Sequence, residues 1–259
     1  MAQSEELVIL RALARVMLAM LFALAPAPFP FIQQSAALDI QARPAIRPAF
    51  AAQLELLRPT ILLAAKRHNR PELSHMSDQE FAVVLTQIMY NEHFGWLEEA
   101  IPPLQPITPL YQAAQVVANQ AGSDFTVWPS NLRPSVGVEL LRGELPIPGG
   151  VMSVPVSISG TQIALYSFHD QRALYAAVNT EIAQPDLAIE YLAANLERGI
   201  YRARYERTPV TWQALAAWHN QGIVLPTTIQ ANPTALHYLR RAAAYRRAAE
   251  QFIQNTPPS

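Results

Sequence analysis

The chain has 259 residues, of which 51% are hydrophobic and 15% charged, so it is long enough to bury a substantial core. A formal net charge of −1 gives no basis for nucleic-acid binding, and the absence of cysteine excludes disulfides, thiol catalysis and zinc–thiolate sites. The six histidines show no metal-ligand spacing, so we expect neither a metal ion nor another cofactor.

The N-terminal segment contains an apolar run at 16–25, preceded by Arg11 and Arg15 and followed by prolines. Basic residues before a short apolar stretch are typical of a secretory signal, and a somewhat longer run could span a membrane. We therefore predict that 1–25 is a signal peptide or an N-terminal membrane anchor. Either outcome exports the protein to the cell envelope, with membrane contact through this segment. The alternative is an amphipathic helix packed on the domain.

Residues 26–49 are proline-rich and are predicted to form an extended linker, and residues 50–254 to form one helical domain. Alternating residues around Gly160 predict a small β-hairpin over 153–168. Apolar periodicity predicts a helix from residue 50 that is interrupted at Pro59, and further helices over 77–96, 110–122, 170–183, 186–206, 209–221 and 233–254. The sequence thus indicates a mainly α fold with one minor hairpin.

Local signals fix several helix ends. Ser77 followed by Glu80 is a capping box, Gly222 is a C-cap, and Asn232 before Pro233 is an N-cap followed by proline at the first helical position. The last helix also carries a basic stripe, which we interpret as a solvated face, with contact to anionic lipid or wall polymer as the alternative. The stripe consists of Arg240, Arg241, Arg246 and Arg247.

A glutamate continues the apolar stripe of the helix that begins at Ser77. Phe81, Leu85, Ile88 and Glu92 recur at spacings of four, three and four and fall on one face. Burial and the negative end of the helix dipole both disfavour a carboxylate there, so we predict a raised pKa for Glu92, as a general acid requires. The alternative is that the helix ends by Asn91 and that Glu92 faces water.

Three segments resemble lysozyme-like lytic transglycosylases, in the same order along the chain. "LTQIMYNEHFG" is similar to the end of the catalytic helix, where that family carries one essential glutamate. "NLRPSVG" resembles its Q-I-x-P-x-T-A stretch, with Asn131 at the position of the glutamine. Residues 186–222 resemble its helix pair, which ends in A-A-Y-N-A-G, with His219 at the tyrosine and Asn220 at the asparagine. The resemblance covers about residues 50–222.

The resemblance implies a lysozyme-like fold and cleavage of the β-1,4 bond in peptidoglycan glycan strands, which would be the partner of the domain. Glu92 would protonate the leaving oxygen and then act as a base toward the sugar's own 6-hydroxyl, which removes the need for a second carboxylate. Four acids, Glu98, Glu99, Asp124 and Asp170, are available as a second carboxylate, but nothing in the sequence directs any of them toward Glu92. The product could be an anhydro sugar or a hydrolysed one.

Six residues are the candidate substrate contacts: Tyr90, His93, Asn131, Trp218, His219 and Asn220. Aromatic side chains at helix ends can stack on sugars or belong to the core, and a histidine after the glutamate can contact a sugar or complement the helix dipole. The asparagines can bind N-acetyl groups or be ordinary turn residues. The family's serine after the glutamate is His93 here, which is a departure from its pattern.

Two other functions remain open. The first is a catalytically inactive lysozyme-like module that binds peptidoglycan or acts as a scaffold at the envelope, in which Glu92 would be ion-paired at the surface. The second is a helical interaction protein tied to a membrane, which would have no groove. Convergence of Glu92, Asn131 and Asn220 in space would argue against the second.

Overall fold

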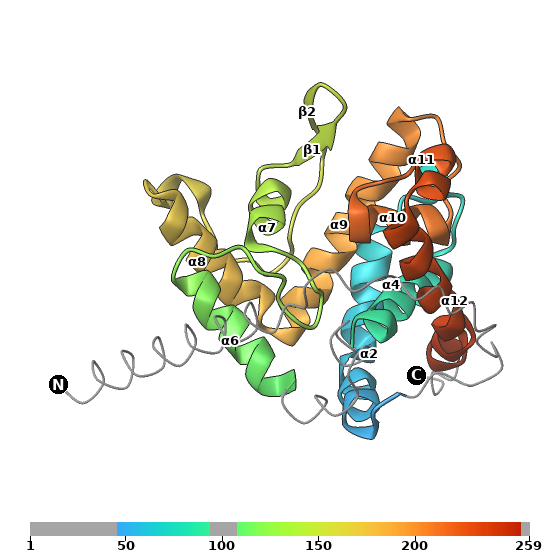
Figure 1. The fold of residues 1–259 in the computed structure, drawn as a ribbon, viewed down its shortest axis with the longest axis horizontal. Coiled ribbons are helices and arrows are strands. Elements are labelled where there is room, and N and C mark those ends of the chain that lie inside the picture. The colour runs from blue at the N-terminus through green and yellow to red at the C-terminus, as the bar shows by residue number, and fades with distance from the viewer. Residues whose placement is uncertain (1–45, 94–107, 255–259) are drawn as a thin grey trace, which may run out of the picture. The chain divides into compact units, whose positions relative to one another are not determined.

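The computed structural model describes residues 46–93 and 108–254. Over these ranges it is mainly helical with one two-stranded antiparallel hairpin, which confirms the predicted mainly α class (Figure 1). In chain order the elements are α2 (Pro48–His68), α3 (Pro71–Ser74), α4 (Asp78–Glu92), α6 (Thr108–Gln120), α7 (Pro134–Leu141), β1 (Glu144–Ile147), β2 (Gly150–Ser153), the 3₁₀ helix η2 (Leu165–Ser167), α8 (Gln171–Ile182), α9 (Pro185–Tyr205), α10 (Trp212–Gln221), α11 (Pro226–Ala231) and α12 (Pro233–Gln254).

The predicted signal peptide or anchor at 1–25 lies outside the described residues, as does most of the predicted linker at 26–49. Helix α2 begins at Pro48, so the last two residues of the predicted linker are helical. Within the described ranges, every helix is too short or too polar to cross a lipid bilayer.

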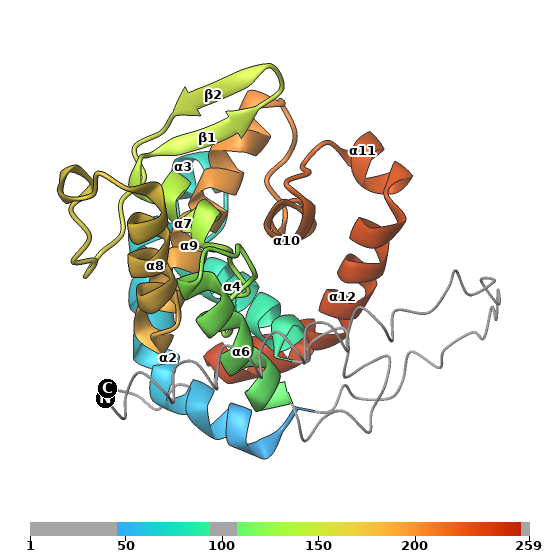
Figure 2. The same ribbon diagram turned by 60° about the vertical axis from the view of Figure 1, so that its left-hand side comes forward.

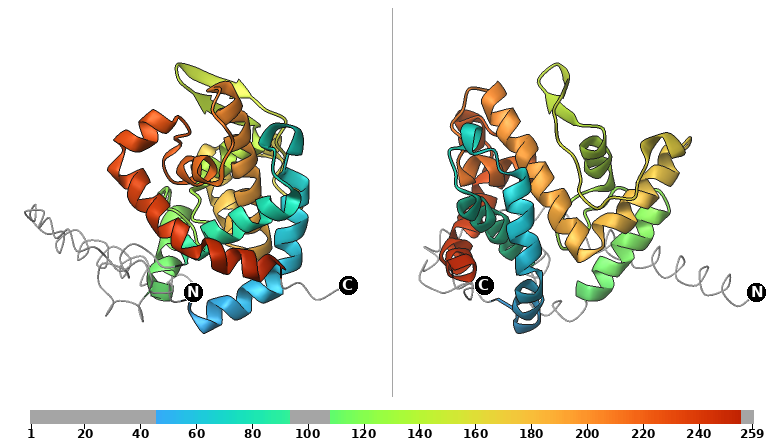
Figure 3. Two further views of the ribbon diagram at one scale, coloured as in Figure 1. Left: turned by 90° about the vertical axis from the view of Figure 1, so that its right-hand side faces the viewer. Right: turned by 180° about the vertical axis from the view of Figure 1, so that it is seen from behind.

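Helix α2 is continuous through Pro59, and the predicted interruption there is wrong. Figures 2 and 3 show that the helix bends instead, and Pro59 lies near its middle. A proline inside a helix removes one backbone hydrogen bond and crowds the preceding turn, which a bend can accommodate. Packing of Leu54 and Ile61, both fully buried, holds the two halves of α2 against the core.

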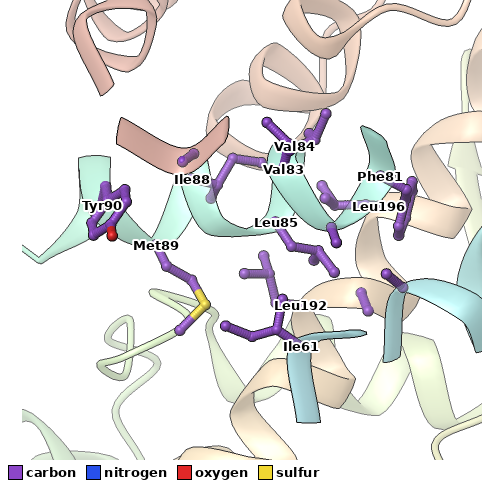
Figure 4. Close-up of a cluster of buried hydrophobic side chains, with 14 of the residues drawn as sticks. Ile61, Phe81, Val83, Val84, Leu85, Ile88, Met89, Tyr90, Leu192 and Leu196 are labelled. Atoms are coloured by element: carbon purple, nitrogen blue, oxygen red, sulfur yellow. The ribbon is translucent and has the colours of Figure 1, made fainter. Parts of the chain in front are cut away.

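Helix α4 begins at the predicted capping box. The Ser77 hydroxyl accepts a hydrogen bond from the Glu80 N–H at 3.2 Å, and the Glu80 carboxylate accepts one from the Ser77 N–H at 2.7 Å. The apolar stripe predicted burial of one face of this helix, whereas every residue from Phe81 to Glu92 is buried. Figure 4 shows Val84 and Ile88 pointing to one side of the helix and Met89 to the other. Helix α4 is therefore a central core helix.

The buried apolar side chains form two core clusters. The first cluster comes from α2, α4, α9, α10 and α12, and the second from α7, α8, α9, β1 and the segments around them. Helix α9 contributes to both, with Leu192 and Leu196 in the first and Tyr191 and Ala194 in the second. Figure 1 shows α9 running between the two groups of helices. The two clusters are therefore packed on a common helix.

The hairpin lies earlier in the chain than predicted. Strands β1 and β2 pair from Glu144 opposite Ser153 to Ile147 opposite Gly150. They are joined by Pro148 and Gly149, and Gly149 has a φ of 86°. Proline followed by a glycine with positive φ is the pattern of a type II turn, so the Pro-Gly pair was the sequence signal for this hairpin.

The segment predicted as a hairpin, 153–168, does not pair with itself. Gly160 does turn the chain, with a φ of 82°. However, the flanking backbone groups bind carboxylates instead of each other: the Ser159 N–H donates to Glu190 and the Gln162 N–H donates to Glu181, at 3.0 and 2.7 Å. The predicted alternation does appear in the burial of the side chains, since Val154, Val156 and Ile158 all belong to the second cluster.

The C-terminal helices follow the prediction closely. Helix α10 ends at Gly222, whose φ is 66° and whose N–H donates to the Trp218 carbonyl at 2.8 Å. Asn232 caps α12 by accepting from the Ala235 N–H at 3.0 Å, and Pro233 is the first residue of that helix. The short helix α11 was not predicted, because six residues are too few to show a periodicity.

A buried charge cluster joins α2 to α9. His68 lies between two glutamates, with Nδ1 at 2.8 Å from Glu197 and Nε2 at 3.0 Å from Glu190. Arg67 and Arg70 approach the same two glutamates from the rim. Burial by itself lowers the pKa of His68, but the hydrogen bonds and negative charges of the glutamates outweigh it and raise the pKa above 6.5. His68 is therefore held as a buried cation between the two glutamates.

Replacement of His68 by glutamine should remove a pH-dependent part of the stability. A raised folded-state pKa contributes stability that is complete below the unfolded value of 6.5 and is lost as the pH rises through the folded value. We expect the wild type to lose free energy of unfolding between pH 6 and pH 9 and His68→Gln to change much less. At pH 6 the variant should be less stable by roughly 3–5 kcal/mol. Denaturant titrations at both pH values, with the exposed His237→Gln as control, test this; equal pH dependence in all three would contradict it.

Candidate functional site

The candidate site is built around Glu92, the last residue of α4. The chain places a carboxylate there at the end of a helix whose apolar residues are packed in the first core cluster. The Glu92 side chain is only 7% exposed. The prediction that it lies on the buried side is confirmed, and the alternative of a solvated glutamate is excluded.

Asn131 approaches Glu92 from the segment that precedes α7. Its Nδ2 donates to Glu92 Oε2 at 2.5 Å. The backbone of Asn131 has a φ of 53°, a left-handed conformation that asparagine adopts more readily than most residues. An antiparallel bridge between Val127 and Leu132 closes this turn and holds the amide in place.

His219 and Asn220 come from the last turn of α10, which the cap at Gly222 terminates. His219 Nε2 lies 3.7 Å from Glu92 Oε1, and both side chains are buried. Asn220 lines the same cavity as Glu92 and Asn131. The structure therefore brings four of the predicted site residues together from three separate segments of the chain.

The predicted raised pKa of Glu92 is wrong. Burial does raise it, but the nearby imidazole of His219 with its positive charge, the hydroxyl of Tyr238 and the charge of Arg241 together outweigh burial and hold the pKa below its usual value. The prediction considered only the helix that carries Glu92, whereas the stabilising groups come from α10 and α12. Glu92 is a carboxylate in the free protein at neutral pH.

Two pockets meet at this carboxylate. The larger pocket, of about 530 Å³, extends along α9 and α10 and is lined by Arg198, Arg202 and Trp218 among others. The smaller pocket, of about 180 Å³, lies between α6 and α12 and is lined by Tyr111 and Trp128 among others. Four residues line both: Glu92, Thr126, Asn131 and Asn220. A chain-like ligand could run from one pocket past Glu92 into the other.

Trp218 forms a wall of the larger pocket, as its predicted role requires. Its Nε1 donates to the Asn195 carbonyl at 2.8 Å, and the guanidinium groups of Arg198 and Arg202 lie 5.5 and 5.8 Å from its ring centre. Close packing against Gly199 fixes the ring from behind. The tryptophan is therefore held rigidly and also belongs to the second core cluster.

Tyr90 and His93 are not at the site. Both are buried and line neither of the two pockets. Tyr90 packs against Phe50 and Tyr245, and His93 stacks on Phe50 with ring centres 4.6 Å apart. His93 Nδ1 donates to the Tyr90 carbonyl at 2.5 Å, while burial lowers the pKa of His93 to about 4. His93 therefore caps the helix as a neutral donor, and the predicted contacts of Tyr90 and His93 with substrate are corrected to core packing.

Several site residues were not predicted from the sequence. Tyr238 and Arg241 of α12 border the smaller pocket and interact with Glu92. Arg198 and Arg202 of α9 line the larger pocket. The predicted basic stripe included Arg241 but assigned it to a solvated face, and only the packing of α12 against α4 and α10 places it at the site. In the described ranges no group of acidic and histidine side chains is arranged to hold a metal ion.

No protein-family profile, curated protein or solved structure matches this chain. The mainly helical class therefore rests on the structure itself, and the lysozyme-like assignment remains a prediction from the motifs. The site is accordingly interpreted from its geometry and its chemistry.

Replacement of Gly199 by alanine should disturb the larger pocket. The added Cβ would lie 2.6 Å from Trp218 Cδ1 and 3.1 Å from a methyl group of Leu215, so the tryptophan must move. Overpacking of this kind costs about 1–3 kcal/mol and should outweigh the gain of about 1 kcal/mol in helix propensity. Chemical unfolding and tryptophan fluorescence measure both effects. Gly150→Ala, where the added Cβ meets open space, is the control, and equal behaviour of the two variants would contradict the prediction.

Proposed function

We propose that this chain is a lysozyme-like domain that cleaves the glycan strands of peptidoglycan, with Glu92 as the general acid and base. The observation that carries the proposal is that Glu92 lines two pockets, one bordered by α9 and α10 and the other by α6 and α12. An enzyme that cuts inside a polymer needs binding space on both sides of the bond that breaks. Glu92 has such space, and the helix that presents it is held by core packing on every side.

The acidic groups around the two pockets are consistent with cleavage by a single carboxylate. Glu139 is the other carboxylate on the described lining of the two pockets, and it pairs with Arg198 at 2.8 Å. Of the four acids weighed from the sequence, Glu98 and Glu99 lie outside the described residues. The other two have structural roles: Asp124 accepts from the Ser135 hydroxyl and N–H, and Asp170 caps α8. A lytic transglycosylase uses the sugar's 6-hydroxyl in place of a second acid, so one glutamate suffices.

Unsatisfied polar atoms also support a ligand at this place. His219 Nδ1 and Asn220 Oδ1 are buried and, within the described residues, have no hydrogen-bond partner. Buried polar atoms are nearly always paired in folded proteins, so such atoms beside a cavity require an explanation. The hydroxyl and N-acetyl groups of an amino sugar could supply the missing donor and acceptor. Under the proposal, Asn131 and Asn220 position the sugar, and Trp218 offers its ring to it.

A second candidate is the catalytically inactive peptidoglycan-binding or scaffold module. The contact between Glu92 and His219 favours it, because a carboxylate with a lowered pKa does not itself hold the proton that a general acid must donate. The same groove would then bind glycan without cutting it. Export to the cell envelope and membrane contact through residues 1–25 belong to both candidates and remain predictions from the sequence.

Glu92→Gln should abolish cleavage and preserve the fold. The amide is nearly isosteric with the carboxylate and can still accept from Asn131, but it cannot transfer a proton; loss of general acid catalysis costs at least about 100-fold in rate. The full chain and the variant are incubated with purified peptidoglycan, and the products are analysed by mass spectrometry. Glu250→Gln, in a half-buried ion pair with Arg246 on α12 that lines neither pocket, is the control.

The products separate the candidates. Anhydro-muropeptides from the wild type and Glu250→Gln, and none from Glu92→Gln, are the expected result. Hydrated reducing ends would instead indicate a muramidase. Such an enzyme needs a second carboxylate, and Glu139 would then be the first residue to replace. Binding to peptidoglycan without any cleavage by the wild type would exclude the enzyme and favour the inactive module.

A further inference from the structure

The Glu92 carboxylate is surrounded by groups that favour its charged form. Asn131 donates to Oε2, and His219 Nε2 lies 3.7 Å from Oε1. From α12, the Tyr238 hydroxyl and the Arg241 guanidinium also act on it. Each of these neighbours supplies a hydrogen-bond donor or positive charge. A proton on Glu92 would compete with all of them, so the carboxyl group does not store the proton that it must deliver.

We propose that His219 and Glu92 form a proton-sharing pair, in which the His219 imidazolium stores the proton that Glu92 transfers to the glycosidic oxygen. The inference rests on the proposed function and names the residue that would make the site work at neutral pH. His219 acts through Glu92 and is therefore a positioning and proton-storing residue. The carrying observation is geometric: His219 Nε2 lies beside the one carboxylate oxygen that Asn131 does not occupy.

The proton balance is simple. The imidazolium Nε2–H gives its proton to Glu92 Oε1, which leaves a neutral imidazole and a neutral carboxyl group. The carboxyl group protonates the glycosidic oxygen as the C1–O bond breaks, and the bonding electron pair leaves with that oxygen. The sugar's 6-hydroxyl then attacks C1 and loses its proton to the Glu92 carboxylate. Return of this proton to His219 restores the pair, so no other reactant is needed.

The remaining charged and titratable groups do not replace His219. Arg198 and Arg202 are in the larger pocket, and each is bound to a carboxylate, Glu139 and Glu206 respectively. Burial and the charge of Glu92 raise the pKa of Tyr238 well above its ordinary value, so this hydroxyl stays protonated at neutral pH. Tyr111 in the smaller pocket also has a pKa raised by burial, and Arg241 is permanently charged. His219 is thus the neighbour of Glu92 whose ring nitrogen, 3.7 Å from Oε1, can both donate and accept a proton.

The position is also where the resembled family carries a tyrosine. A phenol supplies a donor but no cation, so a tyrosine there would leave the proton on the glutamate itself. Replacing the tyrosine by histidine transfers storage of the proton to the neighbouring side chain. We therefore expect the pH dependence of this site to depend on residue 219.

The direct test is the titration of the Glu92 carboxyl carbon by NMR in the full chain with labelled glutamate, using Glu92→Gln to assign the signal. In the wild type we expect two steps, one from Glu92 and one from loss of the imidazolium proton. In His219→Gln we expect a single step, with the Glu92 midpoint raised by at least about one pH unit, because burial then dominates. His219→Tyr should behave as His219→Gln and provides a second variant if glutamine destabilises the fold. The exposed His237→Gln is the control and should match the wild type.

Cleavage rates across pH give the second readout. With His219→Gln or His219→Tyr, the basic limb of the profile should move to lower pH by about one unit, so that the rate above neutral pH falls about tenfold. A Glu92 titration and a pH profile unchanged by both variants would overturn the pair while leaving the proposed cleavage intact. A wild type that shows the two-step titration but cleaves no peptidoglycan would instead overturn the proposed function, and with it the proton transfer.

Discussion

The burial of α4 on all sides fixes the position of Glu92, because α2, α9, α10 and α12 surround this helix. Two of its buried polar residues are satisfied inside the core: Thr86 donates to the Ala82 carbonyl, and Gln87 donates to the Ala242 carbonyl. Sliding or rotation of the helix would break these hydrogen bonds together with the packing. The carboxylate is therefore presented from a rigid support, which a precise site requires.

Helix α9 is the second constraint, since both core clusters are built on it. Toward α2 it carries Glu190 and Glu197, which hold His68, and toward the larger pocket it carries Arg198 and Arg202. Successive helical residues are turned by about 100°. The glutamates and the arginines therefore face different sides of α9, which separates a structural charge cluster from the wall of a cavity. The geometry of the larger pocket consequently depends on how well α9 packs against both clusters. The site is assembled where the two clusters face each other, with Glu92 from the first and Asn131 beside the second.

Features set by a few neighbouring residues could be predicted from the sequence, such as the capping box of α4 and the caps of α10 and α12. The convergence of Glu92 with Asn131, His219 and Asn220 could also be predicted, because the three motifs follow each other in the same order as in the family that they resemble. The hairpin was misplaced because buried alternation at 153–158 looks the same with or without a paired strand. The prediction of a raised pKa for Glu92 failed for a different reason. His219 and Arg241 come from helices distant in the sequence, and no local pattern shows that they lie near Glu92.

The central claim is that one glycan strand occupies both pockets and passes Glu92. The most direct measurement is a titration of Glu92→Gln protein, which should not cleave, with a peptidoglycan tetrasaccharide, followed through the indole N–H signals of its tryptophans. Trp128 lines the smaller pocket and Trp218 the larger one, while Trp212 packs on the first core cluster and lines neither. We predict that the signals of Trp128 and Trp218 shift together with one dissociation constant and that Trp212 does not respond. Shifts at only one of the two, or at neither, would contradict the account.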